Sequence, residues 1–330
     1  MTHNSHKAGF ALPMVLTIVA ILTLTYAVCL NQLVFLTRET RQAIQRAAFD
    51  RVAMSAEARL SYLVTTEPFG AGALNIGSAR NTSNANGQLT QPVVDASSTL
   101  TMDDRPYRFL ENSDSTVPFL ARVQDEAGLF NLYGATVDQL TRLFTQLGEL
   151  DDRDAGNLAT EVQTYNVDST SHQPLRRPSA IFSRIAGMAD LFPPRVRDRL
   201  LDKITAYPDN LAFNINTAPA DVIAILFNVD ETTAQSVVDN REGTTIGTLN
   251  SIGLTSPDPA KAYTFSGGRL RFTFSDPKSG LTYRSSLILT PTNAERPLWV
   301  ENPRTTVTPP PADVEVNDLD PFPDIPDLTS

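Results

Sequence analysis

The chain is poor in cysteine and histidine, with one Cys and three His among 330 residues. Cys29, which lies inside a long apolar run, is the single cysteine, so no disulfide can form within one chain. His3 and His6 precede Gly9, which leaves His172 for all the rest of the chain. A zinc site of Cys/His type therefore lacks ligands, and a Ser/His/Asp triad would have to use His172. That residue lies in a loop-forming stretch and is interpreted as solvent-exposed, so we do not expect an enzyme.

Positive charge is also in short supply, with 27 Lys+Arg against 37 Asp+Glu and a formal net charge of -10. Affinity for nucleic acid depends largely on Lys and Arg that neutralise phosphates, so this balance argues against a nucleic-acid partner. Residues 301–330 contain seven acidic residues, one Arg and seven prolines, a composition that predicts a disordered tail.

No charged residue occurs between Lys7 and Arg38. Residues 10–30 are apolar and long enough to cross a bilayer core of about 30 Å, and no signal-peptidase site follows them. Residues 31–66 contain no Gly or Pro and predict that the membrane helix continues as an amphipathic helix. Its apolar stripe must be covered either by a sheet of the same subunit or by neighbouring helices. The stripe includes Ile44, Val52 and Leu60.

The soluble part begins and ends with strand patterns. Four segments predict strands: "RPYRFLE", "VPFLARVQ", "RLRFTFS" and "LTYRSSLILT". The last two flank "DPKSG", which predicts a hairpin with Gly280 at positive φ. Leu270, Phe272 and Phe274 alternate with Arg269, Arg271 and Thr273, so one face of the sheet is buried and suited to cover the long helix.

Helical patterns replace strand patterns over residues 136–255, which predicts a helical domain inserted into a sheet domain of residues 67–135 and 260–300. Within the insertion, "NINTAPADVIAILFNVDETTAQSVVDNR" predicts a helix-hairpin-helix layout in which Thr217 caps the first helix. In nucleic-acid binders such a hairpin is rich in glycine. Here Asn228 and Asp230 stand in those places, and the acidic charge would repel phosphate.

The N-terminal pattern resembles a known family. "KAGFALPMVLTIVAIL" followed by a long amphipathic helix is similar to the class III leader and first helix of type IV pilins and type II secretion pseudopilins. The resemblance implies a leader of residues 1–9, cleavage after Gly9 by prepilin peptidase, and methylation of Phe10. It also implies an acidic fifth residue in the mature chain, whereas this sequence has Met14. That departure is typical of the K-type minor pseudopilins, the general secretion pathway protein K family.

Two internal segments carry the same resemblance. "DEAGLFNLYGAT" resembles the family signature at the junction of sheet and helical domain, with Asp125, Gly128 and Asn131 in place. "LAFNINTAPADVIAIL", which contains Asn216 and Thr217, resembles the Val-Asn-Thr-Ala segment of the family. We expect structural roles for all five residues: Gly128 supplies a turn, and Asn131 donates or accepts a hydrogen bond at a turn backbone.

Acidic clusters raise the question of a metal. They comprise Asp103 with Asp104, Asp125 with Glu126, and Glu149 with Asp151, Asp152 and Asp154. None has EF-hand spacing, and a solvated acidic face is the simpler interpretation of each. The resemblance nevertheless implies Ca²⁺ in the helical domain, with the metal ligands unknown.

The sequence therefore predicts an α+β pseudopilin fold, in which a long transmembrane and amphipathic helix packs on an antiparallel sheet with a helical insertion. The resemblance implies a single-pass inner-membrane protein with most of its chain in the periplasm. It implies a minor pseudopilin at the tip of the type II secretion pseudopilus, whose partners are other minor pseudopilins. Two alternatives stay open: a minor pilin of a type IV pilus or DNA-uptake fibre, and a membrane-anchored helix-hairpin-helix protein that binds nucleic acid.

Overall fold

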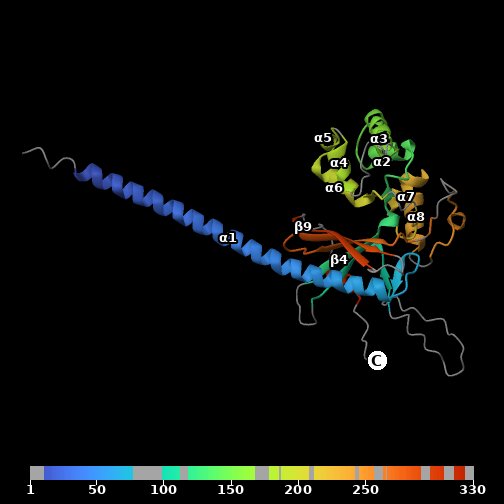
Figure 1. Ribbon diagram of the computed structural model, residues 1–330, viewed down its shortest axis with the longest axis horizontal. Helices are drawn as coiled ribbons and strands as arrows, with labels where there is room; N and C mark the ends of the chain where they lie inside the picture. Colours follow the sequence, from blue (N-terminus) through green and yellow to red (C-terminus); the bar gives the residue numbers. More distant parts are fainter. Residues whose placement is uncertain are drawn as a thin grey trace, which may run out of the picture. The chain divides into compact units, whose positions relative to one another are not determined.

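The computed structural model divides after Val52 into two units, which are described separately (Figure 1). The predicted leader, Phe10 and His172 lie outside the described residues. The structure describes residues 11–76, 99–111, 118–167, 178–185, 187–207, 212–241, 245–255, 263–264, 266–290, 298–307 and 316–323.

A single helix, α1 (Ala11–Thr66), joins the predicted membrane and amphipathic segments without a break. It is long and apolar enough to cross a membrane, with a mean hydropathy of 2.2 over its most apolar stretch. The hydroxyl groups of Thr17, Thr23 and Thr25 donate to carbonyl oxygens one turn earlier. These threonines therefore satisfy their polar groups within the helix, as a lipid environment requires.

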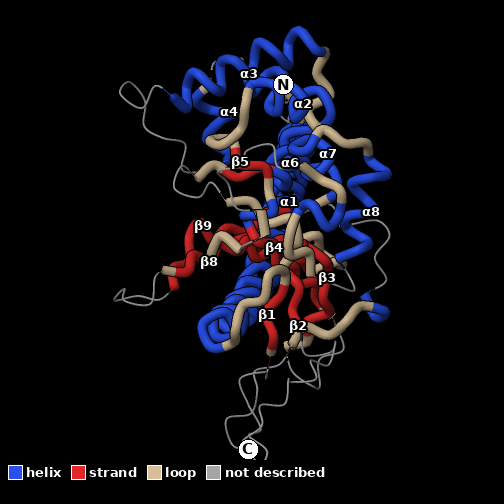
Figure 2. Tube along the Cα trace, turned by 90° about the vertical axis from the view of Figure 1, so that its right-hand side faces the viewer, coloured by secondary structure: helices blue, strands red, loops and turns tan. Residues whose placement is uncertain are grey.

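The second unit contains a five-stranded antiparallel sheet of order β3-β4-β7-β8-β9. The hairpin between β7 and β8 forms as predicted, with Gly280 at φ 70°. A short two-stranded sheet, β1 (Ala73–Asn75) with β2 (Thr99–Thr101), lies nearby (Figure 2). The strands of the main sheet are β3 (Asp103–Phe109), β4 (Phe119–Asp125), β7 (Arg269–Ser275), β8 (Leu281–Leu289) and β9 (Leu298–Val307).

From Ala53 onward, α1 is held against the apolar face of this sheet (Figure 1). The phenol of Tyr283 on β8 donates to Glu57 at 3.1 Å, and the guanidinium of Arg59 lies over the Phe109 ring of β3. The apolar residues on both sides are fully buried, namely Ala56, Leu60, Leu63, Leu270, Phe272 and Phe274. For this part of the helix, the sheet of the same chain covers the stripe.

The predicted helical insertion contains seven α-helices within the described residues: α2 (Val137–Gln146), α3 (Asp152–Val167), α4 (Ile181–Arg184), α5 (Met188–Leu191), α6 (Pro194–Lys203), α7 (Ala220–Phe227) and α8 (Glu231–Arg241). They share one core, in which Leu140, Phe144 and Phe192 are buried. A parallel pair of short strands connects the chain before the insertion to the insertion itself: β5 (Phe130–Asn131) precedes α2, and β6 (Ile204–Thr205) follows α6.

The C-terminal segment differs from the predicted disorder of residues 301–330. Strand β9 continues to Val307, and Pro321 pairs with Arg108 at the edge of β3. The Phe322 ring is 4% exposed and lies edge-on to the Phe109 ring, with centroids 5.8 Å apart. The tail is acidic and proline-rich, but its one aromatic ring can still be buried. Proline is also compatible with a sheet edge, because its missing N–H is not needed there.

Candidate functional site: a buried junction between the sheet and the helical insertion

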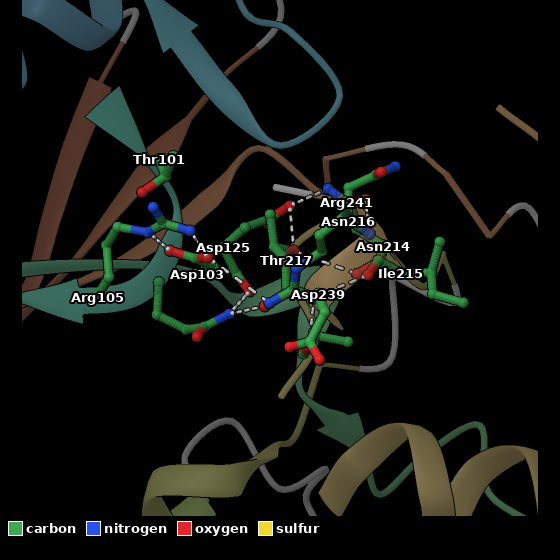
Figure 3. Close-up of polar contacts among 12 residues, drawn as sticks. Thr101, Asp103, Arg105, Asp125, Asn214, Ile215, Asn216, Thr217, Asp239 and Arg241 are labelled. Atoms are coloured by element: carbon green, nitrogen blue, oxygen red, sulfur yellow. Dashed lines mark hydrogen bonds and ion pairs between the residues drawn. The ribbon is translucent and has the colours of Figure 1, made fainter. Parts of the chain in front are cut away.

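The two segments that carry the internal resemblance meet in space. The first leaves β4 at Asp125, passes through the 3-10 turn η2 (Glu126–Gly128) and enters β5. The second, residues 214–217, precedes α7. Figure 3 shows side chains of both segments pointing toward one another. The candidate site is therefore the junction where the sheet passes into the insertion.

Asp125 lies at the centre of this junction and is completely buried. Its Oδ1 accepts a hydrogen bond from the Ala127 N–H at 3.0 Å, which caps η2. Its Oδ2 accepts from the Asn214 side-chain amide at 2.9 Å and from the Thr217 hydroxyl at 3.5 Å. Burial raises the pKa of the Asp125 carboxyl, while the hydrogen bonds from Asn214 and Ala127 oppose that rise. Oδ1 also accepts from the Gly267 N–H at 3.4 Å, so one carboxyl group ties three backbone segments together.

Gly128 is required by close approach. A Cβ at this position would lie 2.5 Å from the Thr217 Oγ1 and 2.7 Å from the Thr217 carbonyl oxygen. Gly128 lies in the 3-10 turn η2, as the sequence predicts, but its φ is not positive, so glycine is needed there for close packing against Thr217.

Two asparagines of the predicted set clamp backbone groups. Asn131 accepts a hydrogen bond from the Tyr133 N–H at 3.1 Å, the kind of turn contact that the sequence predicts, and also donates to the Tyr207 carbonyl. Asn216 accepts from the Ile246 N–H at 2.8 Å and donates to the Ile246 carbonyl at 3.1 Å. In these loops, the two asparagine side chains supply the hydrogen-bond partners that backbone groups in a sheet would find on a neighbouring strand.

The predicted capping role of Thr217 is wrong. The N-cap residue of α7 is Pro219, and no side chain caps that helix. The Thr217 hydroxyl instead donates to the Asn214 carbonyl at 3.2 Å and to Asp125. Thr217 lies two residues before the N-cap position of α7. Its hydroxyl group is buried beside Asp125 and forms its hydrogen bonds there instead of capping the helix.

A second polar bridge at the junction was not predicted from the sequence. Arg241, in the last turn of α8, donates to the Ile215 and Ala218 carbonyls and lies 3.6 Å from the Asp103 carboxylate on β3 (Figure 3). Burial alone would raise the pKa of Asp103, but the hydrogen bond and charge of Arg105, with the charge of Arg241, hold it below its usual value. The bridge ties the last helix of the hairpin to the sheet.

The helix-hairpin-helix layout forms as predicted, with α7 and α8 joined by residues 228–230. Asn228 has φ 55°, the left-handed conformation for which glycine is expected. The Asp230 carboxylate accepts from the Thr232 and Thr233 hydroxyls and from the Thr233 N–H, and these hydrogen bonds lower the pKa of Asp230 to about 2. A fixed negative charge therefore occupies the hairpin, which disfavours phosphate there.

The described acidic residues do not fit a Ca²⁺ site. No three His, Cys, Asp or Glu side chains of this part of the chain lie together as metal ligands. Asp151 accepts from the Asp154 N–H at the start of α3, Glu149 binds Arg199 at 2.8 Å, and Glu126 accepts from Ser286. Calcium needs six to eight oxygen ligands, and these carboxylates point to protein donors. We derive no role for calcium from them.

The remaining predicted site residues are at the N-terminus. Met14 lies on α1 and is 65% exposed. Gly9 lies with Phe10 outside the described residues. Their predicted processing and assembly roles stay predictions.

Comparisons with known proteins bear on the family. No family model matches the chain. Type II secretion system protein K of Pseudomonas aeruginosa is 26% identical over 146 residues, which are 36% of this chain and 43% of that protein. The chain is similar to a K-type minor pseudopilin. The match spans less than half the length of that relative. The crystal structure of the GspK-GspI-GspJ complex from the enterotoxigenic Escherichia coli type 2 secretion system matches with a TM-score of 0.46 at 15% identity. That match covers 80% of this chain and 99% of the other.

Proposed function

We propose that this chain is a minor pseudopilin that assists assembly of a type II secretion pseudopilus and protein export across the outer membrane. Helix α1 is the observation that carries the proposal. One uninterrupted helix is apolar and exposed where it would lie in lipid, and from Ala53 it is covered by its own sheet. A helix of this kind can move between a bilayer and a bundle of like helices without refolding the soluble unit. The similarity to protein K supports the secretion system over a type IV pilus.

Two features support the proposal of a place at the tip. The exposed side chain at Met14 has no charge to offer the N-terminal ammonium of a neighbouring subunit, and an unpaired charge is costly in an apolar bundle. The helical insertion, from α2 to α8, adds bulk to one side of the sheet and would hinder another subunit from stacking there (Figure 1).

The proposal includes location and partners. The chain is held by α1 in the inner membrane with the sheet and insertion in the periplasm, and prepilin peptidase cleaves after Gly9. Its partners are other minor pseudopilins of the same system. It has no catalytic role of its own: the buried polar groups of the junction are used to join two parts of the fold.

Complementation of a deletion strain tests the function. We expect deletion of the gene to abolish secretion of the type II substrates and the wild-type chain to restore it. A chain in which Gly9 is replaced by a bulky residue should be expressed, remain uncleaved and fail to restore secretion. Loss of pilus-dependent motility or DNA uptake with normal secretion would contradict the proposal and favour the minor pilin alternative.

A further inference from the structure

The sheet face opposite α1 carries a row of arginines. Strand pairing places them on one face, because Arg122 lies opposite Thr273, Thr273 opposite Arg284, and Arg284 opposite Arg304. Arg271 and Arg269 occupy alternate positions of β7 beside Thr273 and so share that face. Five arginines from four strands therefore lie side by side under the insertion.

Four of these arginines have a carboxylate partner. They are Arg122 with Asp104 at 3.8 Å, Arg269 with Glu301 at 4.0 Å, Arg271 with Glu126 at 3.7 Å, and Arg284 with Asp202 at 2.8 Å. Among the residues that the structure describes, no ion pair reaches Arg304. The fifth arginine is thus the exception in an otherwise neutralised row.

The position of Arg304 makes this exception costly. It is directly opposite Arg284 on the neighbouring strand, and like charges in that arrangement repel. Partial burial, together with the charges of Arg284 and Arg271, lowers the pKa of Arg304, although the charges of Asp202 and Asp198 partly oppose this. An anion between the two guanidinium groups would remove the repulsion.

A cavity is present at this place. Its volume is about 250 Å³, and its lining includes Arg271, Arg284, Arg304, Glu126, Ser286 and Tyr207. Within the lining, Glu126 neutralises Arg271, and Arg284 is neutralised by Asp202, which is not a lining residue. One positive charge, that of Arg304, remains, so the cavity matches a ligand with a single negative charge. A phosphate, with up to two charges, would be repelled by Glu126.

The geometry points to this cavity as a binding site for one carboxylate group, held between Arg304 and Arg284. The carboxylate belongs either to a free small acid or to an aspartate or glutamate side chain of another polypeptide. A planar guanidinium binds a carboxylate through two parallel hydrogen bonds, which distinguishes it from a spherical anion such as chloride. This inference does not depend on the proposed secretion function.

Arginine-specific modification of the full chain in detergent micelles tests the site. The rate of phenylglyoxal addition at each arginine is followed by mass spectrometry at constant ionic strength. Propionate and N-acetyl-aspartate amide, which each carry one carboxylate, represent the free acid and the side chain. We expect at least one of them to slow modification of Arg304 saturably, by about fivefold or more. Arg195, which is 82% exposed on α6, serves as the control in the same sample and should be unaffected. Tighter protection by the blocked aspartate would identify a polypeptide as the source, and tighter protection by propionate would identify a free acid.

Three results would overturn the inference: no protection of Arg304, equal protection of Arg304 and Arg195, or stronger protection by inorganic phosphate or chloride. A variant gives an independent readout. Without carboxylate, Arg304→Gln should melt at or above the wild-type temperature, because the repulsion with Arg284 is gone. With carboxylate, it should lose the increase in melting temperature seen in the wild type. A lower melting temperature of the variant without ligand would show that Arg304 already has an internal partner.

Discussion

The Asp125 carboxylate and the Asn214 side-chain amide are separated by 89 residues in sequence and by 2.9 Å in space. Both side chains are completely buried. Asn214 also donates to the Ala71 carbonyl, so the hydrogen bond joins the strand that leaves the sheet, the segment that enters α7 and the connection after α1. A buried network of this kind is costly to leave partly satisfied.

Asp125→Asn should therefore destabilise the soluble unit. The new amide would turn an N–H₂ group toward the N–H₂ group of Asn214, and a buried donor would lose its acceptor. We expect the free energy of unfolding, measured by urea denaturation of the full chain in micelles, to fall by about 2–4 kcal/mol. Asp239→Asn, on the exposed side of α8, is the control and should change it by less than about 0.5 kcal/mol.

Gly128→Ala and Gly156→Ala should have opposite effects. A Cβ at position 128 collides with the backbone and hydroxyl of Thr217, and the variant should lose about 2 kcal/mol or more. Gly156 lies inside α3 with no atom within 4 Å of an added Cβ, so alanine there should stabilise the chain by about 0.5–1 kcal/mol. Equal thermal shifts of the two variants would disprove the packing role of Gly128.

The lowered pKa of Asp103 predicts that part of the free energy of unfolding is lost at acidic pH. Because this pKa is lowered in the folded chain, the ionised carboxylate stabilises the fold above its unfolded pKa of about 3.9 and loses that contribution as the pH falls through the folded pKa. The difference in unfolding free energy between the wild type and Asp103→Asn should be constant above about pH 5 and shrink below about pH 4. A difference that stays constant down to about pH 2 would contradict the bridge to Arg105 and Arg241.

Phe322→Ala should release the C-terminal segment. The ring is buried between β3 and Arg59 of α1, and its removal leaves a cavity, so we expect a loss of about 3 kcal/mol and faster proteolysis after Val307. Phe69→Ala removes a ring that is 36% exposed and is the matched control. Unchanged proteolysis in Phe322→Ala would show that the segment does not depend on this ring.

Met14→Glu tests the tip assignment. We expect the variant to insert in the membrane, to be cleaved after Gly9, and to remain at one end of each fibre, because the insertion still hinders stacking. Labelled wild-type and variant chains can be counted along isolated fibres by immuno-electron microscopy. Regular decoration along the length of wild-type fibres would refute a place at the tip.

The elements that the sequence predicts are those with strong local signals. Thr136 and Gln139 form a complete capping box at the start of α2, and Gly280 closes the β7–β8 hairpin. Helix α3 lies within the stretch that the sequence predicts to be helical, but its own residues do not single it out, because its buried face includes the small residues Ala155 and Ala159, which give a weak periodic signal.

The candidate site was only partly predictable for a different reason. The resemblance selected Asp125, Gly128 and Thr217, but their partners depend on contacts between distant segments. Asn214 and Arg241 carry no local pattern that separates them from surface residues. Likewise, the burial of Phe322 depends on a gap between a helix and a sheet edge, which composition cannot describe.

The contact between Arg59 and Phe322 also determines the order in which parts of the fold can form during synthesis. The two residues are 263 positions apart, so the apolar start of α1 leaves the ribosome long before the strand edge and ring that complete its soluble end. Contacts of such long range form late. The apolar part of α1 can therefore meet a bilayer while the rest of the helix still lacks its sheet, and the second unit closes only after nearly the whole chain has been synthesised.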